Sequence, residues 1–363
     1  MTVTHDTLPR ADGFRMPGEH EPQQAVLMIW PERPDNWREA ACHAQRQFVA
    51  VATAIAEVTP VIMCANADQV GNARQQLPAS VAVVDIASDD SWMRDVGPTY
   101  VVNDSGGVRG VDWQFNAWGG ELDGLYSPWD RDAAVAARVL EIRGEDRYAA
   151  PLILEGGSIH VDGEGTLYTT EECLLHPSRN PGLSRADIEA LLADFLAVDK
   201  FIWLKRGLYK DETNGHIDNL LHLVSPGEVV LSWCDDADDP MYDICREALA
   251  TLSAERDARG REIVIHKLPI PGPLYMTEEE FSGLRCAGHA NRRSGERLGG
   301  SYANFLITNN RIICPQLDPA RDAQAVEILE GLFPAHEVVG VNSREILLGG
   351  GNIHCITQHI PQG

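Results

Sequence analysis

Basic residues are scarce in this 363-residue chain: 30 Lys and Arg stand against 54 Asp and Glu, a formal net charge of −24 at pH 7 with His neutral. This deficit argues against a nucleic-acid partner, because phosphate backbones are bound through a basic face. It also argues against an anionic membrane as partner. An acidic body favours cationic ligands through long-range steering, although the same charge can serve only for solubility.

Long apolar runs are also missing. The longest early run, Ala25–Trp30, is far shorter than the roughly 18 residues of a membrane span. The first residues lack the basic and then apolar blocks of a secretory signal. The sequence therefore predicts a cytoplasmic protein. At 44% hydrophobic and 23% charged residues, it can bury a large core.

Several cofactor motifs are absent. The eight cysteines are scattered without a C-x-x-C pair, which disfavours a structural zinc site. The chain has no P-loop, no G-x-G-x-x-G after a strand and no H-E-x-x-H. Nucleotide binding is disfavoured for that reason. The cysteines are Cys42, Cys64, Cys173, Cys234, Cys245, Cys286, Cys314 and Cys355.

Apolar recurrence at a spacing of three to four residues predicts helices over residues 38–56 and, after the N-cap Ser184, over 184–195. Weaker helical patterns cover 130–142, 240–258 and 321–332. Short strands are expected between them, at Val26–Trp30, Val61–Cys64, Val81–Ile86, Thr99–Val102, Ile202–Leu204, Val229–Ser232, Ile263–Leu268 and Ile346–Leu348.

One local pattern recurs five times: a polar residue opens an apolar strand, a Gly or Asn turn follows, and a second apolar strand returns. The segments begin at Pro98, Ser158, His216, Ser301 and, less completely, Asn352. Such repetition predicts an α/β repeat architecture with blades around a centre. No linker divides the chain, so residues 1–363 are expected to form a single domain, with 1–15 as a candidate flexible end.

Reactive side chains gather at or beside these segments, in Trp92-Met-Arg-Asp95, Glu155-Gly-Gly157, Asp211–Asp218 and Gly349–Cys355. If residues 216–218 are extended, His216 and Asp218 point to the same side. Each residue alone has an ordinary structural explanation, such as a buried thiol or a core histidine. Their convergence at polar breaks in apolar strands indicates a site.

Two chemistries compete for this site. His216, Asp218 and His222 could bind Zn²⁺ or Fe²⁺, but an extended strand places His222 about 20 Å from His216. Alternatively, two carboxylates hold a planar guanidinium, a thiolate attacks its carbon, and a histidine protonates the departing ammonia. The functional cysteine is then expected to be unusually acidic. Strand alternation places His354 opposite Cys355, so the base comes from elsewhere.

The sequence resembles the agmatine deiminases of the guanidine-modifying pentein superfamily over essentially its whole length. The resemblance rests on residues 16–22 and 30–38, on Trp92-Met-Arg-Asp95 and Leu154-Glu-Gly-Gly157, and on the specific blocks 211–218 and 349–358. Residues 33–38 separate this family from the related peptidylarginine deiminase-like proteins. Gly18 and His20 depart from the Ala and the Phe or Trp expected there, which affects a lip of the pocket at most.

The resemblance implies a five-bladed α/β-propeller of ββαβ repeats that hydrolyses agmatine to N-carbamoylputrescine and ammonia, in polyamine synthesis or agmatine catabolism, without metal or other cofactor. It implies Cys355 as nucleophile, His216 as general acid and base, Asp95 and Asp218 as guanidinium partners, and Glu155 as the residue that orients His216. Trp92 is expected to wall the channel, and Glu212 to meet the distant ammonium.

Two rival functions remain open. The five-bladed architecture also resembles that of a ribosome-binding anti-association factor, an interaction protein without a nucleophile. The Cys/His/Asp/Asp/Glu set in this sequence argues against that function. Arginine deiminase needs basic partners for the α-carboxylate of its substrate, and the sequence shows no second basic cluster beside the site motifs. The oligomeric state, including a homo-oligomer, is left open.

Overall fold

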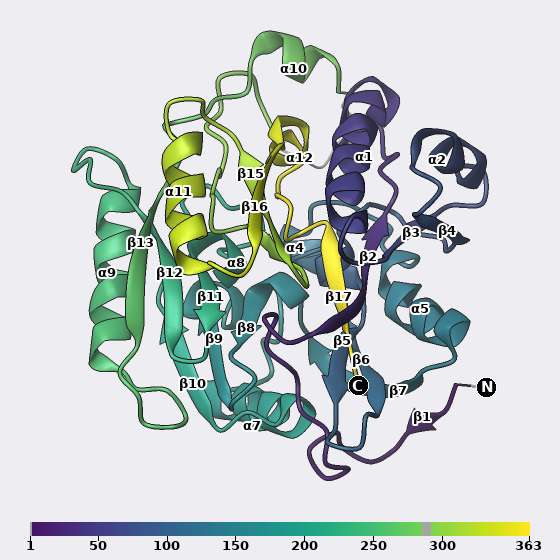
Figure 1. The fold of residues 1–363 in the computed structure, drawn as a ribbon, viewed down its shortest axis with the longest axis vertical. Helices are drawn as coiled ribbons and strands as arrows, with labels where there is room; N and C mark the ends of the chain where they lie inside the picture. The colour runs from purple at the N-terminus through teal and green to yellow at the C-terminus, as the bar shows by residue number, and fades with distance from the viewer. Residues whose placement is uncertain (1, 285–291) are drawn as a thin grey trace.

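A computed structural model describes residues 2–284 and 292–363, in which the strands form five sheets (Figure 1). Two sheets have four strands each. The strand order of one is β1 (Thr4–His5), β7 (Asp146–Ile153), β6 (Val108–Gln114), β5 (Thr99–Val102). The strand order of the other is β17 (Thr357–Pro361), β2 (Gln23–Ile29), β3 (Val61–Ala65), β4 (Ala82–Asp85). Three have three strands: β8 (Ile159–Val161), β9 (Thr166–Thr170), β10 (Lys200–Leu204); β11 (Leu221–Ser225), β12 (Glu228–Trp233), β13 (Val264–Pro269); and β14 (Leu306–Ile307), β15 (Arg311–Gln316), β16 (Glu337–Asn342).

Each sheet repeats one connectivity, an antiparallel pair followed by a helix and a parallel strand. The antiparallel pairs are β5–β6, β8–β9, β11–β12, β14–β15 and β17–β2. The connecting helices are α5 (Val135–Arg143), α7 (Arg185–Leu196), α9 (Met241–Ala254), α11 (Asp322–Leu332) and α1 (Cys42–Ala56). The α/β class and the recurring pattern predicted from the sequence are confirmed.

The last strand of the chain lies in the same sheet as the early strand β2. The last strand, β17, pairs antiparallel with β2, with Thr357 opposite Met28 (Figure 1). Strand β2 is buried along nearly its whole length, because α1 packs on the same hydrophobic core. This explains the continuous apolar run at residues 25–30, which a strand covered on both faces requires.

The remaining helical segments are short: α2 (Val70–Gln76), α3 (Met93–Val96), α4 (Gly120–Asp123), α6 (Glu171–Leu174), α8 (Ile217–Leu220), α10 (Glu278–Ser282), α12 (Arg344–Leu348) and the 3₁₀ turns Glu39–Ala41, Asp132–Ala134 and Gly156–Ser158. Within the described ranges, no helix combines the length and the apolarity that crossing a membrane requires.

One element prediction is wrong, and one helix begins later than predicted. Ile346–Leu348 belongs to α12 instead of a strand, because a three-residue buried apolar run fits either structure. The helix expected from residue 38 begins as a regular α-helix only at Cys42, after Ala40 and Ala41 adopt left-handed conformations with φ of 52° and 64°.

Near the N-terminus, β1 pairs with β7, and Arg15 forms a β-bridge with Val102.

Candidate active site

The predicted site residues occupy one recurring position, directly before the first strand of a sheet. Asp95 lies in α3 before β5, Glu155 precedes the turn that leads into β8, and Cys355 precedes β17. His216 and Asp218 stand at the start of α8, before β11. All five side chains are buried. The repeat therefore brings residues from distant parts of the chain to one place.

The local conformation differs from the extended one expected at two of these positions. His216 precedes the short helix α8, and Asp218 lies in its first turn. Residues 353–356 form a turn before β17, so strand alternation does not separate His354 from Cys355. His354 nevertheless faces two carboxylates: Nδ1 lies 2.8 Å from Asp218 Oδ2, and Nε2 lies 2.8 Å from Glu19 Oε1.

Gly157 lies at the centre of the predicted residues. A Cβ at this position would lie 2.6 Å from His216 Nδ1, 2.9 Å from Asp218 Oδ2 and 3.0 Å from Asp95 Oδ1. Real Cβ atoms essentially never approach other atoms as closely as the first two distances and rarely as closely as the third, and a glycine allows this approach. The geometry thus brings together the histidine and both guanidinium-binding candidates.

Asp95 is held by neutral donors. Its Oδ1 accepts from the backbone N–H of Gly157 at 2.9 Å, and its Oδ2 accepts from Trp118 Nε1 at 2.8 Å. Burial raises the pKa of Asp95 to about 6; His216 opposes this shift, and Asp218 and Glu155 add to it. An opposite charge between the carboxylates would relieve this repulsion.

His216 lies between two acids. Its Nδ1 is 3.9 Å from Asp95 Oδ2, and its Nε2 is 3.7 Å from Glu155 Oε2. Burial opposes protonation, but Asp95, Cys173 and Glu155 together raise the pKa of His216 well above its usual value. His216 is therefore positioned to carry a proton at neutral pH.

The sequence reasoning missed Arg179, which fixes Glu155. Arg179 Nε donates to Glu155 Oε1 at 2.7 Å, and both side chains are fully buried. Burial alone would raise the pKa of Glu155, but Arg179 and then His216 lower it to about 2. A permanently charged Glu155 keeps His216 basic. In the sequence, Arg179 is a single arginine after Ser178 and belongs to no motif, so nothing there indicated this role.

Asn304 is a second residue that the motifs missed. Its Oδ1 lies 3.4 Å from Cys355 Sγ and accepts from the backbone N–H of His354 at 3.0 Å. Asn304 lies just before β14, the first strand of the sheet β14–β15–β16, and so occupies the same position that the predicted site residues occupy in the other four sheets. The repeat beginning at Ser301 was the signal that could have found it, but an amide is neither acid nor nucleophile.

The expectation that Cys355 is unusually acidic is wrong for this structure. Burial raises the pKa of the thiol well above its usual value, and Asp218 and Asp95 raise it further. Asp218 Oδ2 lies 3.7 Å from Sγ. A cation placed between these carboxylates would offset their effect, so the thiolate is favoured once a cationic ligand is bound.

A cavity opens onto Cys355 and Asp95, and Trp92 lies on its wall. Glu212 also lines it, but its two oxygens accept from Arg292 Nε and Nη2 at 2.8 and 2.6 Å. Arg33 is a further lining residue, and it pairs with Asp35 through Nε at 2.6 Å.

The metal alternative finds no support at this cavity. His222 does not join His216; it lies with Glu19, His160 and His354. Glu155, Cys173 and His216 could together present three ligand atoms, but Glu155 already binds Arg179. Each cysteine in the described ranges is free; Cys286 lies outside them.

The model of the Porphyromonas-type peptidyl-arginine deiminase family matches residues 15–361. The chain belongs to this family. A relative named agmatine deiminase, from Pseudomonas aeruginosa, is 59% identical over 356 residues, covering 97% of each chain. The solved structure of the Enterococcus faecalis agmatine deiminase is 45% identical, with a TM-score of 0.97 over all of both chains. A C. jejuni agmatine deiminase, a Cys-to-Ser variant with substrate bound, is 26% identical, with a TM-score of 0.83, covering 96% of this chain and 97% of that one.

These matches confirm the resemblance to agmatine deiminases, including the pentein fold. The separation from peptidylarginine deiminase-like proteins that residues 33–38 predicted does not extend to the family model, which carries their name. The two departures from the family pattern contact each other: a Cβ on Gly18 would collide with the imidazole of His20. Neither residue lines the cavity at Cys355. They flank Glu19 instead, so they affect the surroundings of that carboxylate and not a lip of the pocket.

Proposed function

We propose that this protein hydrolyses agmatine to N-carbamoylputrescine and ammonia. The observation that carries the proposal is the convergence of Asp95, Asp218 and His216 around Gly157, with Cys355 Sγ 3.7 Å from Asp218. A planar cation with N–H donors satisfies both carboxylates. The name shared by the relatives adds the substrate.

In the proposed mechanism, Asp95 and Asp218 hold the guanidinium, the Cys355 thiol loses its proton to solvent as this cation binds, and the thiolate attacks the guanidinium carbon. The C–N bond to one terminal nitrogen then breaks, and protonated His216 gives that nitrogen the proton with which it leaves as ammonia. The product of this step is an amidino group on Cys355. Glu155, held by Arg179, keeps His216 oriented and basic.

His216, now neutral, then accepts a proton from water, whose oxygen adds to the amidino carbon. The C–S bond breaks and the added hydroxyl loses its proton to solvent, which releases the carbamoyl product and restores the thiolate. Atoms balance as agmatine plus water giving N-carbamoylputrescine plus ammonia. The same histidine acts as acid in the first half and base in the second.

The charges around the cavity favour agmatine over arginine. The cavity does contain two arginines, which the sequence reasoning did not place there. Arg33 and Arg292 are each paired with a carboxylate, Asp35 and Glu212 respectively. Neither is left to bind an α-carboxylate. An agmatine ammonium at Glu212 would share the oxygens that Arg292 now contacts, and Trp92 would wall the substrate chain.

We propose further that the five sheets are blades of a five-bladed propeller formed by a single domain over residues 1–363. Their shared connectivity and the pairing of β17 with β2 support this arrangement.

Ammonia release from a panel of agmatine, arginine and a peptidyl-arginine tests the function. We expect turnover of agmatine with kcat/KM at least about a hundredfold above arginine, because arginine would bury a carboxylate without a free partner. Equal turnover of arginine, or release only from the peptide, would contradict the proposal.

The salt dependence tests whether the net charge of −24 guides the substrate to the site. Agmatine is dicationic, so screening between low and high ionic strength should lower kcat/KM while kcat changes less. Stopped-flow or initial-rate measurements at several NaCl concentrations would detect this. A flat kcat/KM would assign the acidity to solubility or show that encounter is not limiting.

Asp95 is expected to produce the acidic limb of the pH profile. Its pKa is raised to about 6, so the carboxylate takes up a proton as the pH falls through that value and loses the guanidinium. kcat/KM should then fall tenfold per unit below pH ~6. Asp95→Asn should lose well over tenfold in kcat/KM at pH 8 and no longer show this limb. Near-normal turnover by the folded variant would remove Asp95 from the site.

A further inference from the structure

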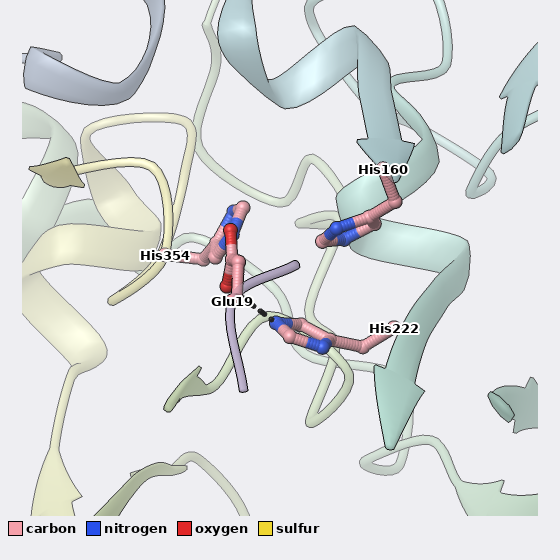
Figure 2. Close-up of side chains that lie close together, drawn as sticks. All are labelled: Glu19, His160, His222 and His354. Carbon is pink, nitrogen blue, oxygen red and sulfur yellow. Dashed lines mark hydrogen bonds and ion pairs between the residues drawn. The ribbon is translucent and has the colours of Figure 1, made fainter. Parts of the chain in front are cut away.

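Four ionisable side chains, which we call the histidine cluster, lie close together: Glu19, His160, His222 and His354 (Figure 2). The three histidines are buried, and the Glu19 side chain is only 10% exposed. They come from the N-terminal segment, from β8, from β11 and from the turn before β17. None lines the cavity at Cys355. The mechanism above uses none of them.

His354 connects this cluster to the active site. Its Nδ1 lies 2.8 Å from Asp218 Oδ2, and its Nε2 lies 2.8 Å from Glu19 Oε1. Ionised carboxylates only accept hydrogen bonds, so an imidazole between two of them must donate from both nitrogens. Only the imidazolium form can do so. The far end of the chain is Asp218 Oδ2, the atom 3.7 Å from Cys355 Sγ.

Arg94 stabilises the ionised form of Glu19. Its Nη1 donates to Glu19 Oε1 at 2.8 Å, and both side chains are largely buried. Burial opposes ionisation, but Arg94, His354 and His359 hold the pKa of Glu19 well below its usual value. For His354, burial and Arg94 oppose protonation, while Glu19 and Asp218 outweigh them and raise its pKa.

The other two histidines do not share this proton. The rings of His160 and His222 lie 5.1 and 5.2 Å from that of His354. Burial lowers the pKa of His160 well below its usual value, and the neighbouring histidines add to this shift. Burial also lowers the pKa of His222, whose Nε2 stands 3.4 Å from Glu19 Oε2.

A metal ion fits this arrangement less well than a proton does. The four residues bring ligand atoms within 4.8 Å of one another. Two carboxylates, Glu19 and Asp218, are already balanced by Arg94 and protonated His354. A divalent ion replacing that proton would leave excess positive charge in a buried place.

We propose that Glu19 and His354 are positioning residues that keep Asp218 ionised and oriented for the guanidinium. This proposal rests on the proposed function. Without the imidazolium, Asp218 would lose the cation that is hydrogen-bonded to it and would keep only the attraction of His216 and Arg94, so its pKa would rise. Burial already opposes its ionisation, and the hydrogen bond from His354 heads the influences that lower its pKa.

Glu19→Gln tests the proposal, because it keeps the shape and removes the charge that holds the proton on His354. Glu21→Gln is the matched control. Glu21 lies two residues away and binds Arg15 through both oxygens, at 2.7 and 2.8 Å, but it does not contact His354. Both variants lose one arginine pair on the same segment. Only the first should alter Asp218.

We expect Glu19→Gln to raise KM for agmatine at least about tenfold. We also expect Asp218 to replace Asp95 as the carboxylate that takes up a proton first as the pH falls, which moves the acidic limb of kcat/KM upward by about one pH unit. Glu21→Gln should reproduce the parent profile. An unchanged pH profile in Glu19→Gln, with only a lower Tm, would overturn the proposal, since a merely structural role would affect stability alone.

Nitrogen-15 NMR of the parent protein tests the charge state without any variant of Glu19. Among the histidine signals, that of His354, assigned by its loss in His354→Asn, should show both ring nitrogens protonated at pH 8. A neutral His354, or stoichiometric zinc in the purified parent, would overturn the proposal. The proposed function would fail separately, through absent ammonia release from agmatine.

Discussion

Cys355→Ser should lose turnover of agmatine by at least about a thousandfold, because a hydroxyl cannot be ionised at neutral pH as a thiol can. The fold should persist, since the replacement is nearly isosteric and Asn304 Oδ1, 3.4 Å from Sγ, can accept from a hydroxyl. Ammonia release, with circular dichroism for folding, measures both outcomes. Retained turnover would show that the nucleophile lies elsewhere.

Cys42→Ser is the matched control, because Cys42 is half-buried at the start of α1 and lies away from the active-site cavity. It should keep parent activity. A loss equal to that of Cys355→Ser would contradict the assignment.

Labelling with a cationic and with a neutral reagent distinguishes Cys355 from the other cysteines. A cationic haloacetamidine placed between Asp95 and Asp218 offsets the charges that raise the pKa of Cys355, so it should label that residue faster than a neutral haloacetamide does. Agmatine should protect Cys355. Peptide mapping by mass spectrometry that finds the amidine mainly on another cysteine would contradict the mechanism.

The location of the site could be predicted from the sequence because the repeat and the reactive residues coincide. Five polar breaks in apolar strands predicted five equivalent positions, and four of them carried an acid, a histidine or a thiol. The structure places each break before the first strand of a sheet. Motifs of a known family then supplied a role for each residue, which periodicity alone could not.

The remaining properties depend on contacts that cross the fold. Arg179 acts through Glu155, 24 positions earlier in the chain, and no local spacing connects them. The charge on Cys355 depends on Asp218 and Asp95, which lie far from it in sequence, so the general rule that a catalytic thiol is acidic gave the wrong sign for the ligand-free protein. Short turns such as α8 also escape periodicity, because one helical turn contains too few residues to show it.

The pairing of Glu212 could not be predicted from the sequence either. The family resemblance implied that Glu212 meets the distant ammonium, but Arg292, 80 positions later, donates to both of its oxygens. The acid count of a motif therefore overstates the negative charge that a substrate meets. The pairing partner must be known before a role can be assigned.

Gly157→Ala should lower kcat/KM by at least about a hundredfold, although it adds a single methyl group far smaller than any catalytic side chain. The new Cβ would lie 2.6 Å from His216 Nδ1, 2.9 Å from Asp218 Oδ2 and 3.0 Å from Asp95 Oδ1, so at least one of these must move. Displacements of about 1 Å in catalytic groups cost on the order of a hundredfold. Ammonia release at saturating and limiting agmatine separates kcat from KM.

Gly71→Ala is the control for the added methyl. Gly71 lies in α2, and among the described residues nothing beyond its own helix backbone and chain neighbours stands within 4 Å of the place that a Cβ would take. Since alanine favours a helix by about 1 kcal/mol over glycine, this variant should keep full activity and gain stability. Gly157→Ala with parent kinetics would mean that His216, Asp218 and Asp95 tolerate separation, and the compact clamp proposed around the guanidinium would then be wrong.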